Sequence, residues 1–309
     1  MLGPVPPQST MPQVSIIIPL YNDWIALDSC LRSIAEQGYA GGLEVIVVDD
    51  GSATPAPENI SQWKATLPLT IVGQSHKGVS AARNRGIQLS RGEVVLFVDA
   101  DCRLQANCLA ALESTMAGSP QQNYFQLRLI GDCSTVVGRS EHLRFDAMQH
   151  QMLRTDGSVR YLNTAAFAIR RSSLEVGSRL FNPVARRGED TLLLADLILR
   201  NELPFLATDA AVLHIVPLTV LQCLRKDLRS AFLEGGTFAL IADRGIRIRI
   251  DNRERLKMLR LTWVAARQPS IGKLAWFVLL SRQLLSRLTS LIYQLLHKRV
   301  RQQELQPLN

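Results

Sequence analysis

Short apolar runs alternate with segments of helical periodicity over the first third of the chain. Residues 14–18, 43–48 and 94–98 are rich in Val, Ile and Leu, a pattern typical of buried strands. Between the first two runs, residues 25–34 place Ile and Leu side chains on one face of a helix. No hairpin-type turn separates these segments. The pattern therefore predicts a strand–helix–strand unit in a parallel sheet with right-handed crossovers.

Polar and acidic residues follow each apolar run where the predicted strand ends. Asp99 and Asp101 follow the third run, Asp-Asp-Gly-Ser at 49–52 follows the second, and residues 19–22 follow the first. Ligands of open parallel sheets bind beyond the carboxyl ends of the strands, so we expect these segments to meet at one edge. Two carboxylates this close repel each other unless a cation neutralises them, and Mg²⁺ would leave positions open for substrate phosphates. A merely solvated acidic loop is the alternative interpretation of the Asp-x-Asp pair.

A small-residue and basic segment, Gly78–Gly86, lies between the second and third acid-tipped strands. We expect Ser80 to cap a helix whose first turns carry Arg83 and Arg85. Backbone donors there, together with a forked guanidinium, suit the phosphates or the base of a nucleotide. An ordinary exposed arginine on a surface helix is the alternative for either residue taken singly.

Four segments, 14–22, 44–52, 78–86 and 92–102, together resemble the nucleotide-sugar-binding half of the inverting glycosyltransferases of family 2. The resemblance extends over about residues 13–215. It implies the GT-A fold, an α/β domain with a mostly parallel central sheet flanked by helices. It also implies a nucleotide-diphospho-sugar donor and Mn²⁺ or Mg²⁺ as cofactor.

The same resemblance implies roles for individual positions in the donor site. Pro19, Tyr21 and Asn22 match the segment that flanks the base, and Asp50 matches the residue that hydrogen-bonds a uracil-type base. The remaining matches are Arg83 with the nucleotide, Asp99 with the ribose and Asp101 with the metal ion that binds the diphosphate.

The residues expected to bind the acceptor and to catalyse the transfer lie further along the chain. Residues 161–171 resemble the acceptor-side segment of the family, without the glycine usual near its middle. Glu189 and Asp190 precede a helical pattern and match the motif whose Asp is the general base, with Glu189 on the acceptor side. Acids also stabilise the first turn of any helix, which is the structural alternative. His214, in an apolar run, is either a core histidine or a further ligand of the metal ion.

The sequence thus predicts a metal-dependent inverting enzyme that moves one sugar, most simply from a UDP-linked donor, to a hydroxyl of a glycan or lipid-linked acceptor in cell-surface polysaccharide synthesis. The Gln-x-x-Arg-Trp motif of processive synthases is not matched, because Lys226 follows Gln222-Cys-Leu-Arg. Two alternatives remain at this point. One is a non-catalytic binding or scaffold protein with the same fold. The other is a nucleotidyltransferase, which is disfavoured because the sequence has no glycine-rich, lysine-bearing phosphate loop near the N-terminus.

Composition adds a strong asymmetry of charge. The chain has 309 residues, 47% of them hydrophobic, and a net charge of +8. From Arg244 onward, fourteen Lys and Arg face three Asp and Glu, a net of +11 that leaves about −3 for the rest. Leu284, Leu288, Leu291 and Leu295 share one helical face, as in basic amphipathic helices that lie on anionic membranes. A helix that packs on its own domain or on a partner is the alternative, and nucleic acid is disfavoured because no recognition motif accompanies the charge.

These observations predict three regions. They are a flexible tail at 1–12, the glycosyltransferase domain at 13–240, and a basic, largely helical region at 241–309 that meets a membrane surface or a partner. No signal peptide is evident, and the five cysteines form no Cys-x-x-Cys pair. We therefore expect a cytoplasmic protein, either free or peripheral on the inner face of the cell membrane.

Overall fold

The computed structural model describes residues 13–174, 179–185, 187–243, 245–246 and 250–304. The tail predicted at 1–12 lies outside these ranges. The chain forms two compact units. The first contains residues up to 129, 152–183 and 197–214, and the second contains 130–151, 184–196 and the chain from 215 onward. The sequence-based boundaries at 13–240 and 241–309 divide the chain differently and stay a proposal.

An eight-stranded mixed sheet forms the centre of the first unit, in the order β3-β2-β1-β4-β7-β6-β8-β5. Its strands are β1 (Val14–Leu20), β2 (Leu43–Asp49), β3 (Leu69–Gly73), β4 (Val94–Val98), β5 (Cys102–Leu104), β6 (Tyr124–Gly131), β7 (Ala166–Arg170) and β8 (Phe205–His214). The predicted parallel sheet is confirmed for β3, β2, β1 and β4. Beyond β4, the pairs β4–β7, β6–β7 and β5–β8 are antiparallel.

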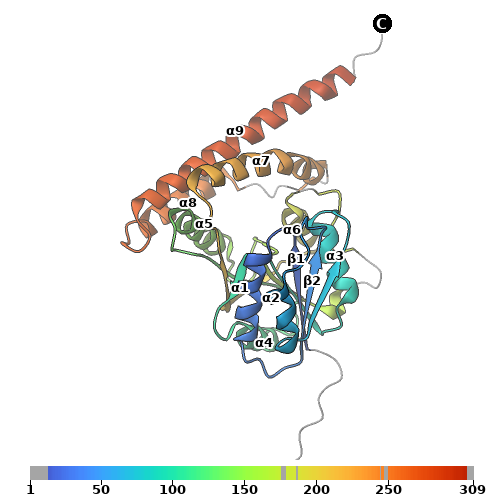
Figure 1. The fold of residues 1–309 in the computed structure, drawn as a ribbon. Coiled ribbons are helices and arrows are strands. Elements are labelled where there is room, and N and C mark those ends of the chain that lie inside the picture. Colours follow the sequence, from blue (N-terminus) through green and yellow to red (C-terminus); the bar gives the residue numbers. More distant parts are fainter. Residues whose placement is uncertain (1–12, 175–178, 186, 244, 247–249, 305–309) are drawn as a thin grey trace, which may run out of the picture. The chain divides into compact units, whose positions relative to one another are not determined.

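Helices cover this sheet because each carries an apolar face toward it. They are α1 (Trp24–Ala35), α2 (Glu58–Gln62), α3 (Val79–Leu89) and α4 (Cys108–Gly118), with short 3₁₀ turns at Trp63–Ala65 and Arg171–Ser173. Helix α1 packs beside α2, as Figure 1 shows, and α3 packs on β1 and β2. The chain runs outward from β1 to β3 and returns to β4 on the other side of β1, so right-handed crossovers put α3 on the opposite face from α1.

Close approach of α3 to the sheet depends on Gly86. A Cβ at this position would lie 2.3 Å from a methyl carbon of Ile17. The buried side of α1 is formed by Leu27, Leu31 and Ile34, which are almost completely removed from solvent. Burial of each such side chain contributes about 1.5–3 kcal/mol. This packing holds the carboxyl ends of β1, β2 and β4 at one edge.

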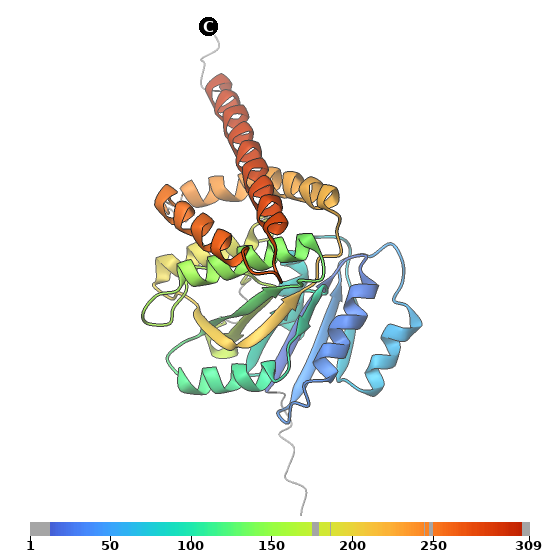
Figure 2. The same cartoon turned by 90° about the vertical axis from the view of Figure 1, so that its left-hand side faces the viewer.

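The second unit is helical. Its elements are α5 (Val136–Met152), α6 (Glu189–Arg200, whose last residues belong to the first unit), α7 (Val220–Asp243), α8 (Asn252–Ala265) and α9 (Lys273–Glu304). Helix α9 packs against α7 and α8 (Figures 1 and 2). One of its apolar clusters joins Leu143 of α5 to Ala275 and Leu279 of α9. Within the part of the chain that the structure describes, none of the helices combines the length and the apolar character that crossing a bilayer requires.

Candidate nucleotide-sugar site

The loops that follow β1 and β2 bind each other at the carboxyl edge of the sheet. Asn22, at a positive φ of 59°, accepts the backbone N–H of Ala53 at 2.7 Å and donates its own N–H to Ser52 Oγ at 2.8 Å. Ser52 in turn donates its hydroxyl to Asp49 Oδ1 at 2.6 Å. The backbone N–H of Asp50 donates to the carbonyl of Leu20 at 2.8 Å. The predicted meeting of residues 19–22 and 49–52 is therefore observed.

Asp50 is buried and organises the loop that follows β3. Its Oδ1 accepts from Gln74 Nε2 and from the backbone N–H of Lys77, both at 2.8 Å. Its Oδ2 accepts the backbone N–H of Gly78 at 2.8 Å and lies 2.9 Å from His76 Nδ1. A carboxylate has about four acceptor positions, so these neighbours occupy all of them. A nucleobase would reach this carboxylate only by displacing a side chain, either Gln74 or the largely exposed His76.

His76 is a residue that the sequence patterns did not single out. Its ring stacks on that of Tyr21, with centroids 4.3 Å apart and an interplanar angle of 30°. Tyr21 is half exposed, whereas Pro19 lies within β1 opposite Val48. The two aromatic rings thus form an exposed platform next to Asp50, a surface suited to stacking a planar group. The only feature of the sequence that could have pointed to His76 is its position, in the loop between a strand and the helix of the Gly78–Gly86 segment.

Arg83 is buried and holds Asp99. Its Nη2 lies 2.7 Å from Asp99 Oδ1, and its guanidinium carbon is 5.6 Å from the ring centre of Phe181. Only 2% of the Arg83 side chain is exposed, against 33% of Asp99. The expectation that Ser80 caps this helix is wrong. The helix begins at Val79, and Gly78 at φ 90° is the capping residue, because the backbone turns there through a conformation that glycine adopts freely.

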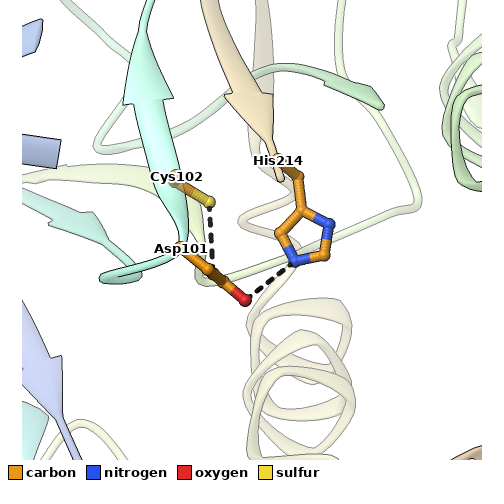
Figure 3. A group of neighbouring side chains, drawn as sticks. All are labelled: Asp101, Cys102 and His214. Atoms are coloured by element: carbon orange, nitrogen blue, oxygen red, sulfur yellow. Dashed lines mark hydrogen bonds and ion pairs between the residues drawn. The ribbon is translucent and has the colours of Figure 1, made fainter. Parts of the chain in front are cut away.

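Asp101, Cys102 and His214 lie together, and Asp101 is two residues beyond Asp99 in the chain (Figure 3). His214 Nε2 is 3.4 Å from Asp101 Oδ2, and Cys102 Sγ is 3.8 Å from Asp101 Oδ1. The antiparallel pairing of β5 with β8 produces this proximity, because Cys102 is the register partner of His214. One ligand atom from each of the three residues lies within 4.8 Å of the others. Asp101 and His214 thus come from chain segments more than a hundred residues apart.

These side chains fit a divalent cation with open coordination positions. Burial raises the pKa of the Cys102 thiol well above its usual value, and the charges of Asp101 and Asp99 raise it further. Mn²⁺ and Mg²⁺ prefer oxygen and nitrogen ligands to sulfur, which leaves one carboxylate oxygen and one imidazole nitrogen. Ions such as Mn²⁺ accept this donor pair and complete their shells with phosphate oxygens and water.

The acceptor-side segment at 161–171 contributes β7 only from Ala166 onward. Before it, Asn163 accepts the backbone N–H of Ala165 at 3.0 Å, and the backbone N–H of Asn163 donates to Gln126 at 2.7 Å. The alanines at 165 and 166 are buried. The segment therefore combines an ordered turn with the start of a strand that pairs with β4.

Glu189 and Asp190 belong to the second unit, where they begin α6. Asp190 Oδ1 accepts the backbone N–H of Thr191 at 2.6 Å. Gly188, at φ 78°, precedes them, and Thr237 of α7 donates its hydroxyl to the carbonyl of Arg187 at 2.5 Å. A Cβ on Gly188 would lie 3.4 Å from Thr237 Cγ2. Helix α7 thus fixes the turn that presents the two acids.

Glu234 lies one turn before Thr237 on α7. Burial raises the pKa of its carboxyl, while the charges of Arg187 and Arg144 lower it. Glu189 is also buried. Glu189, Glu234, Arg144 and Arg187 therefore form a cluster of charged side chains at the turn before α6. All four belong to the second unit.

Comparison with known proteins decides the family. Residues 15–177, just over half of the chain, match the family model described as glycosyl transferase family 2. The chain belongs to this family. It is 35% identical over 114 residues to the glycosyltransferase AglE of Haloferax volcanii, a match that covers 36% of this chain and 38% of that protein. It is 37% identical over 115 residues to an N-acetylglucosaminyltransferase of Bradyrhizobium elkanii, covering 34% and 60%.

Solved structures show the fold of this family 2 chain. The mannosyltransferase PcManGT of Pyrobaculum calidifontis, in complex with GDP-Man and Mn²⁺, superposes with a TM-score of 0.60 at 19% identity, covering 93% of this chain and 89% of that one. Residues 1–349 of S. aureus TarS, in complex with UDP-GlcNAc, give a TM-score of 0.54 at 17% identity, covering 94% and 92%. The predicted GT-A fold is confirmed. The matched region spans only about a quarter to two fifths of the first curated relatives.

The first unit also has a cavity, whose lining includes Glu93 and Glu113. Its volume is about 530 Å³, and it lies at the amino ends of β1 and β4, where Val14, Val94 and Leu112 contribute to its lining. Donors of open parallel sheets bind at the carboxyl edge. The cavity therefore lies at the opposite end of these strands from the edge that carries Asp50, Asp99 and Asp101.

Proposed function

We propose that the protein is a metal-dependent inverting glycosyltransferase. It moves one sugar from a nucleotide-diphospho sugar, with UDP as the favoured nucleotide, to a hydroxyl of a glycan or lipid-linked acceptor in cell-surface polysaccharide synthesis. The observation that carries this proposal is the Asp101–His214 pair at the carboxyl edge of the sheet, where Asp101 is two residues beyond Asp99, the ion-pair partner of Arg83. Ligands of open parallel sheets bind at this edge, and the chain belongs to a family of glycosyltransferases. Both facts support a nucleotide site there.

In the proposed reaction, Asp101 and His214 would hold Mn²⁺ or Mg²⁺, and the bound cation would stabilise the negative charge of the departing diphosphate. Arg83 holds Asp99 in place beside the ribose, and Tyr21 with His76 offers a stacking surface to the base. Pro19 and Asn22 shape the loop around the base. These residues bind and orient the donor, so that the anomeric carbon is presented to the acceptor.

Asp190 is the proposed general base. An inverting transfer is an in-line displacement, in which the acceptor oxygen forms a bond to the anomeric carbon as the bond to the diphosphate oxygen breaks. The acceptor hydroxyl loses its proton to Asp190, while Glu189 lies on the acceptor side. Support comes from the position of both acids in the first turn of α6 and from the hydrogen bond that Thr237 makes to the preceding turn.

Two different nucleotides occur in the structural neighbours. PcManGT was solved with GDP-Man and Mn²⁺, and TarS with UDP-GlcNAc. Peripheral contact with the inner face of the cell membrane, through the basic C-terminal region at 241–309, is the second part of the proposal. The net charge of +11 from Arg244 onward supports it.

The direct test is a donor screen with Mn²⁺, followed by a transfer assay. At a hundred times its dissociation constant, a bound nucleotide should raise the unfolding free energy by about 2.7 kcal/mol. UDP and GDP are compared in the same thermal-shift series, and release of nucleoside diphosphate is then measured with a set of acceptors. A shift with GDP and none with UDP overturns the choice of base.

The same assays separate the two alternatives. A scaffold protein would bind nucleotide without turnover, and Asp190→Asn would change nothing. A nucleotidyltransferase would release pyrophosphate instead of a nucleoside diphosphate. For the proposed enzyme, Asp190→Asn lowers kcat by about 10²- to 10⁴-fold and leaves nucleotide binding intact.

A further inference from the structure

Helix α9 has an exposed apolar row along its length. Leu274, Phe277, Leu284, Leu288, Leu291 and Leu295 are each between 53% and 64% exposed, and Ile292 beside them is nearly half exposed. Successive members of the row, with Ser281 included, are three or four residues apart, so they share one narrow side of the helix. Exposed leucines scattered singly are ordinary, but a continuous row of this length indicates a binding surface.

The opposite side of α9 is the one that packs on its own unit. Ala275 and Leu279 are buried against α5 and the α8–α9 loop. Arg282, also buried, donates from Nε to Asp227 of α7 at 2.6 Å and from Nη1 to Ser140 of α5 at 3.0 Å, and it pairs with Glu141. This charged anchor fixes the rotation of α9 about its axis. Within the second unit, the apolar row therefore lies on the side of α9 that faces away from α5 and α7.

Helix α8 supplies the charge. Arg253, Lys257 and Arg260 are exposed and recur at the spacing of one helical face, and Arg267, just beyond the end of the helix, is exposed as well. Between them on the same face lie Leu256, Leu261 and Val264, which are exposed as well. The acids nearest to this face, Asp251 and Glu254, are engaged in the capping box at the start of the helix.

The first half of α7 repeats the combination. Leu221, Leu228 and Phe232 are exposed apolar residues, and Arg225 and Arg229 are exposed between them. Three helices of one unit thus present apolar and basic side chains together on their solvent sides. Interleaved leucine and arginine is the pattern by which helices lie in the headgroup region of an anionic bilayer.

We propose that the solvent-exposed faces of α8 and α9 form a docking surface for an anionic lipid bilayer. The inference deepens the membrane contact proposed above and rests on it. Leucines of α9 enter the boundary between headgroups and acyl chains, and the basic residues of α8 meet lipid phosphates. Charge complementarity favours a bilayer over a second copy of the chain, since two copies would bring together two regions of net charge +11 each.

The test is vesicle co-sedimentation of the full chain. Phosphatidylcholine vesicles are compared with vesicles that also contain phosphatidylglycerol, at low and at high salt. We expect at least about tenfold stronger binding to the anionic vesicles, lost in large part at high salt because the Lys and Arg contribution is screened.

Two triple variants locate the surface. Leu284→Gln/Leu288→Gln/Leu291→Gln removes the apolar row, and Arg253→Gln/Lys257→Gln/Arg260→Gln removes the charge. Each is expected to weaken binding to anionic vesicles by about tenfold or more. The matched control, Ile25→Gln/Leu153→Gln/Leu199→Gln, removes exposed apolar residues of the first unit and should bind like the wild type.

Three results overturn the proposal. The first is that the wild type binds neither type of vesicle. The second is that the α9 triple variant binds anionic vesicles as well as the control variant does. The third is that the wild type shows no preference for anionic vesicles and forms a dimer, which the α9 triple substitution dissociates. Thermal shift by nucleotide with Mn²⁺ is measured on every variant. Because that signal reports the donor site alone, failure of vesicle binding and failure of the proposed enzymatic function are told apart.

Discussion

Arginines serve opposite purposes in two regions of the molecule. At the carboxyl edge of the sheet, Arg83 is buried and its guanidinium meets the carboxylate of Asp99. On α8, Arg253 and Arg260 are exposed, with apolar side chains between them on the same face. A buried charge is costly unless it is paired, so Arg83 reports on the internal architecture of the site. The exposed arginines are solvated by water and need no internal partner, and the proposed anionic bilayer would account for their clustering.

The largest effect expected at the edge comes from Asp101. Asp101→Asn keeps the shape of the side chain but removes the charge that would hold the metal ion, and kcat for transfer should fall by about a thousandfold. The free energy of unfolding should change little, because the carboxyl is nearly a third exposed. Measurement of turnover and thermal stability on the same sample checks both. Turnover within about twofold of the wild type would remove Asp101 from the site.

Arg83 sharpens the contrast between buried and exposed charge. Arg83→Met leaves Asp99 without its partner and should cost about 2–3 kcal/mol of unfolding free energy. Arg260→Met, the matched change on α8, should alter it by less than about 0.5 kcal/mol. Urea denaturation of the two variants measures the difference. Equal effects would contradict the distinction drawn between the two regions.

A smaller effect is expected where α7 holds the turn before α6. Thr237→Val removes the hydroxyl that donates to the carbonyl of Arg187 and should cost about 1 kcal/mol of stability. If Asp190 is the base, kcat should also fall several-fold, with KM for the donor unchanged. Thr237→Ser restores the donor and should restore kcat. A purely structural role would lower stability in Thr237→Val without the change in kcat.

The smallest effect concerns the pH dependence of stability. Burial raises the pKa of Glu234 above its usual value of 4.5, so the folded state holds the proton more firmly than the unfolded state does. The stability that this preference contributes is present at low pH and is lost as pH rises through the folded pKa. Glu234→Gln should therefore stabilise the protein by up to about 1 kcal/mol at pH 7, and the gain should vanish near pH 4. A gain that persists at pH 4 would contradict this assignment.

Much of the parallel half of the sheet was predictable because its signals are local. Apolar runs at 14–18, 43–48 and 94–98 fall within β1, β2 and β4, and the absence of hairpin turns predicted their parallel pairing. The antiparallel half was not predicted. Pairing of β4 with β7 joins Val95 to Ile169, and no periodicity within a short window reports a contact over such a separation.

The site was predictable in its residue types and less so in its contacts. Sequence alone left His214 between a core residue and a ligand, and only the register of β5 with β8 places its ring against Asp101. The neighbours of Asp50 include two backbone N–H groups of the turn at 77–78. Every residue has a backbone N–H, so side-chain identity could not have foretold this arrangement. Arg83 was expected at the nucleotide, but its burial against Asp99 and Phe181 depends on packing between distant segments.

The central claim is that Asp101 and His214 together hold a divalent cation for the donor diphosphate. Titration of Mn²⁺ in the presence of UDP, followed by electron paramagnetic resonance of the free ion, measures this directly. We expect one bound Mn²⁺ per chain in the wild type and at least about tenfold weaker binding in both Asp101→Asn and His214→Ala. Unchanged Mn²⁺ affinity in the two variants would contradict the claim.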